Sequence, residues 1–217
     1  MKTKTILLAG TVLGAFATSG VALVAVTHAM VDQRIADNQY QAMQRKLAAI
    51  LPEGASDNDP LRDYIQVEAR ELLGTDATQV YRVRHGDDPV AVVLEPVVPD
   101  GYAGPIRLLV SVMHDGTLGG VRVISHHETP GLGDKIEEAK SDWVYEFKGK
   151  SLTDPPPEKW AVKRDGGEFD QFTGATITPR SVVNAVKNTL IYVQNQGDRL
   201  FEPASEAAEQ PAGDKDR

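Results

Sequence analysis

The 217-residue sequence contains no cysteine, and this absence removes several classes of site at once. Disulfides, cysteine-ligated zinc, iron–sulfur clusters and lipid anchors on cysteine all require a thiol. The absence does not by itself indicate a cellular compartment. It does mean that any redox chemistry in this chain needs a bound cofactor.

The sequence also lacks the excess of basic residues that is typical of nucleic-acid binding. It has 23 Lys and Arg against 31 Asp and Glu, and its formal net charge is −8. Proteins that bind DNA or RNA neutralise phosphates with clustered Lys and Arg, so we expect no nucleic-acid partner. The hydrophobic content of 41% and charged content of 25% are ordinary for a globular domain.

One stretch near the N-terminus has no charged residue at all. No Asp, Glu, Lys or Arg occurs between Thr5 and Val31. The strongly apolar part, residues 6–26, would be about 30 Å long as a helix, which matches a bilayer core. The alternative is a signal peptide cleaved near Thr27-His28-Ala29, but the apolar region of a signal peptide has only roughly 7 to 15 residues. We therefore expect a retained transmembrane anchor.

The charges that flank this stretch predict its orientation. Lys2 and Lys4 precede it, whereas Asp32, Arg34 and Asp37 follow it. Positive residues favour the cytoplasmic side, so we expect a single-pass protein of the bacterial inner membrane with its soluble domain on the periplasmic side.

Small residues recur every four positions in the same stretch, at Gly10, Gly14, Thr18 and Ala22. They would line one face of the helix, which favours close contact with another transmembrane helix. Small residues are also common in membrane spans generally, so both interpretations stay open.

The composition divides the chain into four expected parts. Residues 1–31 form the cytoplasmic N-terminus and transmembrane anchor, and residues 32–58 form a juxtamembrane helix and linker. Residues 59–200 form one folded domain. Residues 201–217 form an acidic tail that has little to bury and is expected to be disordered.

The folded domain is predicted to be α+β, with a mainly antiparallel sheet flanked by helices. Helix start and stop signals at Asp59-Pro60 and Gly74 predict a helix over residues 60–73. Turn signals separate further segments with β-rich composition, and a short helix is expected near Asp134. The predicted strands are residues 81–84, 90–97, 106–113, 118–125 and 160–164.

Three threonines lie at the start of the last predicted helix. In a purely structural interpretation Thr178 caps the helix, Pro179 occupies its first position and Gly174 is a turn residue. That leaves Thr173 and Thr176 unexplained. A helix N-terminus also presents unpaired N–H groups and the positive end of the dipole, so the residues equally allow a phosphate near Thr176.

The segment ETPGLG, residues 128–133, is the second unusual stretch. Its glycines suit a loop that lies close to a flat ligand, although a plain turn between strand and helix explains them as well. His126 and Glu128 would share one strand face, but two ligands are too few for a metal site, and we predict none.

Together the two motifs resemble the covalent FMN-binding domain family. The residues TGAT, 173–176, followed by ITPRSVVNAV, look like the flavinylation motif of that family. The segment 101–136 is similar to the family's region that ends in HxETPGLG. With its N-terminal span the chain resembles the G-subunit family of the Rnf ion-translocating electron-transport complexes. That family is related to the C subunits of the sodium-pumping NADH:quinone reductases.

The resemblance implies a cofactor and its site. FMN would be joined through its phosphate to Thr176 by a separate flavin transferase. The other residues that the two motifs assign to the cofactor are Thr173, Gly174, Ala175, Thr178, Glu128, Thr129, Gly131, Leu132 and Gly133.

The resemblance also implies a function. The chain would be a membrane-anchored flavoprotein that relays electrons within an ion-translocating ferredoxin/NAD electron-transport complex, with other membrane subunits as partners. No acid–base pair or nucleophile stands out, which fits an electron carrier better than a complete enzyme. The alternatives are a membrane-anchored extracytoplasmic binding or scaffold protein without a redox centre, and a flavin-tethered reductase that acts alone.

Overall fold

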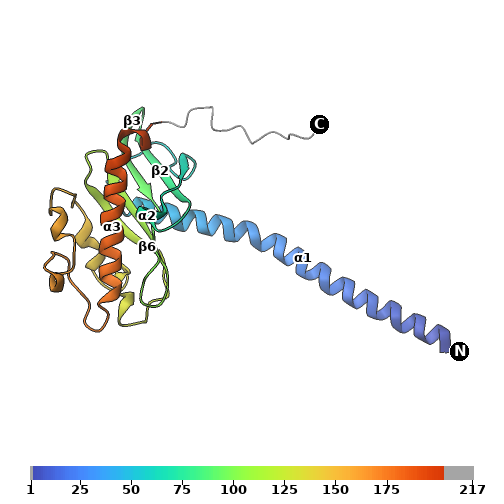
Figure 1. Cartoon of the computed structure of the whole chain (residues 1–217). Helices are drawn as coiled ribbons and strands as arrows, with labels where there is room; N and C mark the ends of the chain where they lie inside the picture. The colour runs from blue at the N-terminus through green and yellow to red at the C-terminus, as the bar shows by residue number, and fades with distance from the viewer. Residues whose placement is uncertain (1, 203–217) are drawn as a thin grey trace, which may run out of the picture. The chain divides into compact units, whose positions relative to one another are not determined.

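The computed structural model describes residues 2–202, and the expected acidic tail from residue 203 onward lies outside the described residues (Figure 1). The chain divides into two compact units, Met1–Arg45 and Lys46–Arg217. Each is described by itself below.

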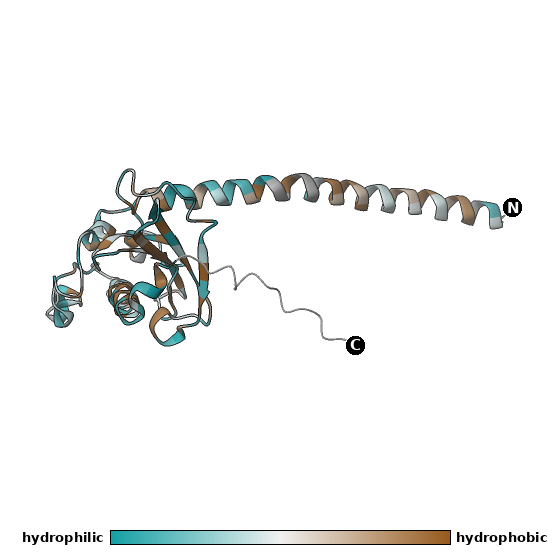
Figure 2. Ribbon diagram, turned by 90° about the horizontal axis from the view of Figure 1, so that it is seen from above, coloured by the Kyte–Doolittle hydropathy of each residue, from teal (hydrophilic) through white to brown (hydrophobic). Residues whose placement is uncertain are grey.

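The first unit consists of helix α1 (Lys2–Ala48), which continues into the start of the second unit. Within it, Ile6–His28 is long and apolar enough to cross a membrane (Figure 2). The hydroxyls of Thr11 and Thr18 donate hydrogen bonds to the carbonyls four residues earlier. This pairing satisfies their polar groups within the helix, as a bilayer requires. The expected juxtamembrane helix is the continuation of α1, without a break at residue 32.

The second unit contains one six-stranded sheet in which every pair of strands is antiparallel, as the sequence predicts. In space β1, β2 and β3 follow one another, β3 and β4 both pair with one side of β5, and β6 pairs with its other side. The strands are β1 (Tyr64–Val67), β2 (Thr78–His85), β3 (Asp88–Leu94), β4 (Val97–Val98), β5 (Ile106–Met113) and β6 (Leu118–Ser125).

The β5–β6 hairpin has the bounds that the sequence predicts. Its turn contains Gly116 at φ 84°, a conformation that favours glycine. Asp115 accepts a hydrogen bond from the Thr117 backbone N–H at 2.9 Å. Because both signals are local, the pattern of the sequence was sufficient to find this hairpin.

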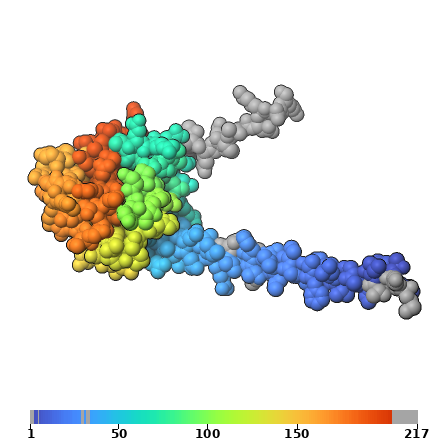
Figure 3. Space-filling model, turned by 60° about the horizontal axis from the view of Figure 1, so that its bottom comes forward, coloured from blue at the N-terminus to red at the C-terminus, as the bar shows by residue number. Residues whose placement is uncertain are grey.

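Helix α3 (Ile177–Gln196) covers one face of the sheet. Its buried side chains join those of the strands in one core, and their stripe is the one expected from the sequence. In Figure 3 the second half of the chain, in orange, lies beside the green strands. The buried residues of the stripe are Val182, Val183, Val186, Leu190 and Val193.

A cluster of aromatic side chains supports the irregular segment between the sheet and α3. Three short 3-10 helices interrupt this segment, η2 (Trp143–Phe147), η3 (Pro157–Lys159) and η4 (Lys163–Asp165). The rings of Trp143 and Phe172 are 5.1 Å apart, and Trp143 Nε1 donates a hydrogen bond to the Asp170 carbonyl at 2.8 Å. The cluster therefore fixes the chain immediately before the TGAT segment.

The other face of the sheet is partly covered by the first residues of the second unit. Ile50 is buried, and a side chain at Gly120 would meet its Cβ at 3.2 Å. Arg122 donates a hydrogen bond to the Ala49 carbonyl at 3.1 Å, and the Lys46 ammonium donates to the Val123 carbonyl. These contacts attach the last turn of α1 to β6.

The helix predicted over residues 60–73 is wrong. Residues 64–67 form β1, which pairs with β2, and only α2 (Arg70–Leu73) is helical. Tyr64 and Gln66 are exposed, whereas Ile65 and Val67 are partly buried, and this alternation suits a strand. The predicted end is correct, because Gly74 closes α2 at φ 70°.

Two further boundaries differ from the prediction. The strand expected over residues 160–164 is only a single bridge between Val162 and Phe169, followed by η4. The expected tail begins too early, because Phe201 is 7% exposed and its carbonyl accepts a hydrogen bond from Arg84. Burial of its ring against the core keeps Phe201 in the domain.

Candidate functional site

The TGAT segment forms a tight turn that leads into α3. The Ala175 N–H donates a hydrogen bond to the Phe172 carbonyl at 3.2 Å, and Gly174 has a φ of 84°. A positive φ at this position favours glycine. Phe172 is buried, whereas Thr173 and Gly174 are exposed. The turn is thus anchored at its first residue and open to solvent at its centre.

Thr176 is the N-cap residue of α3, where the sequence predicted Thr178. Its hydroxyl makes no capping hydrogen bond, and the residue is half-buried. Pro179 is the third helical residue, where the missing N–H costs no helical hydrogen bond. The first turn contains no acidic side chain. A hydroxyl not used as a cap, beside a helix N-terminus without a carboxylate in its first turn, fits a phosphate group.

Thr178 has a different role from the capping role that the sequence predicted. The residue is fully buried, and its hydroxyl donates a hydrogen bond to Glu128 Oε2 at 2.6 Å. Because Thr178 lies within α3 and Glu128 lies in ETPGLG, this bond joins the two motifs. The capping interpretation failed because α3 begins one residue before Thr178.

Glu128 connects three separate segments. Besides Thr178, its carboxylate accepts a hydrogen bond from the Ala103 N–H at 3.1 Å. Its own N–H donates to His126 Nδ1 at 2.9 Å, and His126 Nε2 lies 2.5 Å from Glu137 Oε1. His126 and Glu128 therefore point to different partners. Within residues 2–202 no group of three His, Asp or Glu side chains could hold a metal ion.

The two glycines of the ETPGLG segment have different physical reasons. A Cβ at Gly133 would lie 2.4 Å from Glu128 Oε2 and 3.0 Å from Thr178 Oγ1. The space beside Gly133 is thus filled by protein atoms and explains the glycine without a ligand. Gly131 has a φ of 79° and nothing within 4 Å of an added Cβ, so its conformation favours glycine while the space beside it is open.

Gly101 belongs to the same arrangement, and sequence reasoning did not single it out. A Cβ there would lie 3.0 Å from Glu128 Oε1 and 2.3 Å from the Gly104 carbonyl. The only signal in the sequence is its place at the start of the segment that resembles the FMN-binding family.

Exposed apolar side chains lie on the segments that meet at Thr176. Leu132 Cδ2 would be 3.4 Å from a Cβ added to Gly174, which places ETPGLG next to TGAT. Leu132, Ile177 and Tyr102 are all exposed. The carbonyl of Thr129 accepts hydrogen bonds from the N–H groups of Leu132 and Gly133 at 3.1 and 3.2 Å and so shapes the loop. The site is therefore a surface with apolar side chains beside a threonine hydroxyl.

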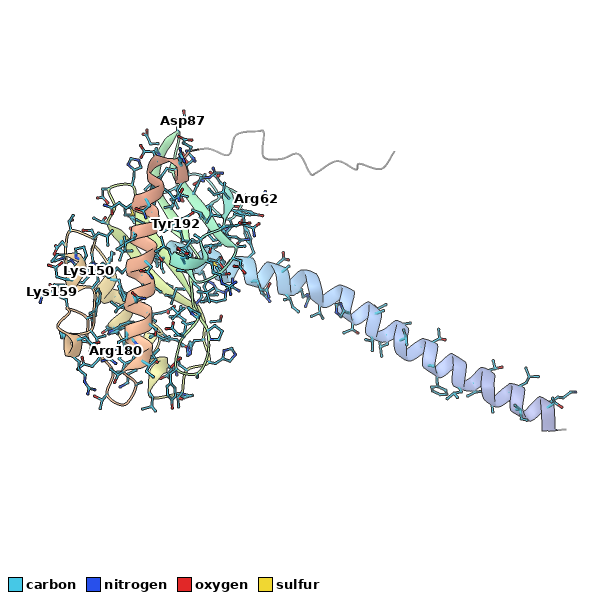
Figure 4. The ribbon with its side chains drawn as sticks, viewed as in Figure 1. Arg62, Asp87, Lys150, Lys159, Arg180 and Tyr192 are labelled. Carbon is cyan, nitrogen blue, oxygen red and sulfur yellow. The ribbon has the colours of Figure 1, made fainter. Side chains whose placement is uncertain are left out.

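An exposed ion pair lies beside the start of α3. Arg180 donates two hydrogen bonds to Asp165, from Nε at 2.5 Å and from Nη2 at 2.6 Å. This hydrogen bonding holds the pKa of the Asp165 carboxyl below its ordinary value. In Figure 4 Arg180 lies at the opposite end of α3 from Tyr192. The pair fixes the guanidinium near the first helical turn.

A cavity of about 330 Å³ lies at the other end of α3. Its lining includes His114, Leu190 and Phe201, and none of the TGAT or ETPGLG residues. The two motifs are therefore separate from this cavity.

Comparison with known proteins finds two matching families. The family described as FMN-binding domain matches residues 101–191, a range that contains both motifs. The family described as RnfG N-terminal region matches residues 1–50.

Relatives are similar over nearly the whole chain, and three of them are named as the G subunit of an ion-translocating oxidoreductase complex. The protein from Pseudomonas aeruginosa is 50% identical over 196 residues, which cover 90% of this chain and 92% of the relative. The protein from Pseudoalteromonas atlantica is 44% identical over 204 residues, 94% of this chain and 95% of the relative. The protein from Shewanella loihica is 46% identical over 195 residues, 89% of this chain and 92% of the relative.

Proposed function

Because the chain belongs to the family of G subunits of ion-translocating oxidoreductase complexes, we propose that it is the membrane-anchored FMN electron-transfer subunit of such a complex. It acts as one subunit and not as a complete enzyme. FMN supplies the electron transfer, and the chain supplies attachment, position and surrounding charge.

Within this role, FMN is bound covalently through its phosphate to Thr176. The observation that carries this assignment is the state of the Thr176 side chain, which is half-buried at the N-cap of α3 and makes no capping hydrogen bond. A phosphodiester there would carry one negative charge at the positive end of the helix dipole. Thr173 is exposed at the turn and Thr178 is committed to Glu128, so neither is as well suited.

Attachment requires a second protein. Thr176 Oγ1 loses its proton and forms the new bond to phosphorus, while a leaving group departs from the phosphorus. A flavin transferase must supply the flavin phosphate in activated form, because an alcohol and a phosphate monoester do not condense spontaneously in water. The exposed TGAT turn leaves the chain accessible to such an enzyme.

The remaining motif residues divide into two groups. Thr173, Gly174 and Ala175 bring the backbone close to the phosphate, and the exposed Thr129, Gly131 and Leu132 offer the adjacent surface to the ring system. Glu128, Gly133 and Thr178 are buried and hold the two segments together.

The partners are the other membrane subunits of the complex. Charges on the two sides of the apolar run support an orientation with the soluble domain on the periplasmic side of the inner membrane, because Lys2 and Lys4 favour a cytoplasmic N-terminus. Covalent attachment suits that location, because a flavin that dissociated there would be lost by dilution. A scaffold without a redox centre is not favoured, because the FMN-binding domain match contains both motifs.

In-gel fluorescence tests the proposed attachment. The full chain is produced together with a flavin transferase, denatured, separated by electrophoresis and illuminated. The parent band should show flavin fluorescence, and Thr176→Val should show none while expressing at a similar level. Thr173→Val is the matched control and should keep at least part of the signal. A dark parent band, with a transferase that labels its own substrate in the same cells, would exclude covalent FMN.

A further inference from the structure

Glu128 is a buried acid without a basic partner. Its residue is 4% exposed, and it forms no ion pair with any side chain among residues 2–202. Its two carboxylate oxygens accept hydrogen bonds from the Ala103 N–H and the Thr178 hydroxyl. Two donors and no nearby cation describe a carboxylate that is solvated by dipoles alone.

This carboxylate lies directly beneath the proposed attachment site. It contacts Thr178, the second residue of α3, and Thr176 is the N-cap of the same helix. It also fills the space beside Gly133, in the loop whose Leu132 packs next to Gly174. The charge is thus held at the junction of the two segments that surround Thr176. Buried charges are screened by salt much less than exposed ones.

We propose that Glu128 is a fixed negative charge that lowers the reduction potential of FMN attached at Thr176. This inference rests on the proposed attachment. When FMN takes up two electrons and one proton from an electron donor, its ring system gains one negative charge. A buried carboxylate nearby makes that gain less favourable, because like charges repel strongly where the effective dielectric constant is low. Glu128 thereby makes the cofactor a better electron donor.

The hydrogen bond from Thr178 acts in the opposite direction. Its O–H dipole partly neutralises the Glu128 carboxylate, and the positive end of the α3 dipole does the same. Loss of the hydroxyl leaves the full charge in place with one donor fewer. The two residues are in direct contact, yet substitutions at them should move the potential in opposite directions.

Spectroelectrochemical titration of the full chain with covalent FMN, at pH 8, tests the inference. Glu128→Gln removes the charge with little change of shape, so the midpoint potential should become more positive than in the parent. Glu128→Asp retains the charge and should remain closer to the parent than Glu128→Gln. Thr178→Val retains the charge and removes its hydrogen bond, so the potential should become more negative.

A purely structural role predicts a different pattern. If Glu128 only ties the loop to α3, Glu128→Gln and Thr178→Val should both lower the melting temperature of the flavin-free chain and move the potential in the same direction, or not at all. Either result overturns the inference. If Glu128→Gln fails to fold or to carry FMN, Thr178→Val decides alone, because an unchanged or more positive potential contradicts the inference.

Failure of the inference is distinguishable from failure of the proposed function. Intact mass is measured first, and the parent must carry FMN that is absent from Thr176→Val. Potentials are compared only among chains that carry this mass. A parent without bound FMN would refute the attachment, whereas a loaded Glu128→Gln chain with the parent's potential would refute only the role of the charge.

Discussion

The hydroxyl of Thr178 donates a hydrogen bond to Glu128 Oε2 at 2.6 Å, although fifty residues separate them in the sequence. Both residues are buried. This bond joins the ETPGLG loop to the first turn of α3, and it replaces the helix-capping role that the sequence indicated for Thr178.

Removal of this hydrogen bond should destabilise the domain. Thr178→Val keeps the shape of the side chain but leaves a buried carboxylate oxygen without its donor, which costs about 1–3 kcal/mol. Thr173→Val, at an exposed position of the same segment, should change the free energy of unfolding by less than about 0.5 kcal/mol. Urea unfolding of the full chain in detergent measures both. Equal effects of the two substitutions would contradict the assigned role of Thr178.

The glycines of the loop should respond differently to alanine. Gly133→Ala brings a Cβ within 2.4 Å of Glu128 Oε2, so it should cost about 1–3 kcal/mol through overcrowding. Gly131→Ala should cost about 1–2 kcal/mol, because only its backbone conformation is unfavourable for alanine.

A double-mutant comparison separates these two causes. Combination with Glu128→Ala should relieve the cost of Gly133→Ala, since the crowding atom is gone, and should leave the cost of Gly131→Ala unchanged. The explanation for Gly133 is wrong if both glycine substitutions combine additively with Glu128→Ala.

Local patterns predicted part of the fold well. The β5–β6 hairpin was found because Asp115-Gly116 and the flanking β-rich runs are signals within a few residues. The segment 60–73 misled because Asp59-Pro60 and Gly74 are also local signals, whereas its strand depends on pairing of Tyr64 with Tyr81. Sheet pairing at long range overrides helix start and stop signals.

The site was also only partly predictable. Both motifs were recognised from the sequence, and the family that matches residues 101–191 confirms the expected FMN-binding domain. The contact between Thr178 and Glu128 could not be derived, because no spacing rule relates residues so far apart. The start of α3 at Ile177 was missed by one residue, which moved the N-cap from Thr178 to Thr176.

Stability should depend on pH through Glu146, which precedes the TGAT segment in the aromatic cluster. Burial raises the pKa of its carboxyl, although a hydrogen bond from the Asp170 N–H opposes the shift. With the higher pKa in the folded state, folding is coupled to proton binding, so stability falls as pH rises from the unfolded pKa through the folded pKa.

Glu146→Gln removes this loss and keeps an acceptor for the Asp170 N–H. The free energy of unfolding of Glu146→Gln, relative to the parent, should therefore increase between about pH 4 and pH 7. Chemical unfolding of both full chains across this range provides the measurement. A difference that stays constant with pH, or decreases, would show that burial of Glu146 does not govern its ionisation.

The orientation of the protein in the membrane is directly testable. A reporter enzyme that is active only after export, fused after Arg217, should be active, because Lys2 and Lys4 favour a cytoplasmic N-terminus. A reporter that is active only in the cytoplasm should be silent at the same position. The reverse pattern would overturn the proposed orientation.

Mass spectrometry of one tryptic peptide tests the central claim most directly. Cleavage after Arg164 and Arg180 releases residues 165–180, which contain all three candidate threonines. From the full chain produced with a flavin transferase, this peptide should carry the mass of FMN less one water, and fragmentation should place that mass on Thr176. The same peptide from Thr176→Val should be unmodified. Added mass on Thr173 or Thr178, or an unmodified parent peptide beside a demonstrably active transferase, would contradict attachment at Thr176.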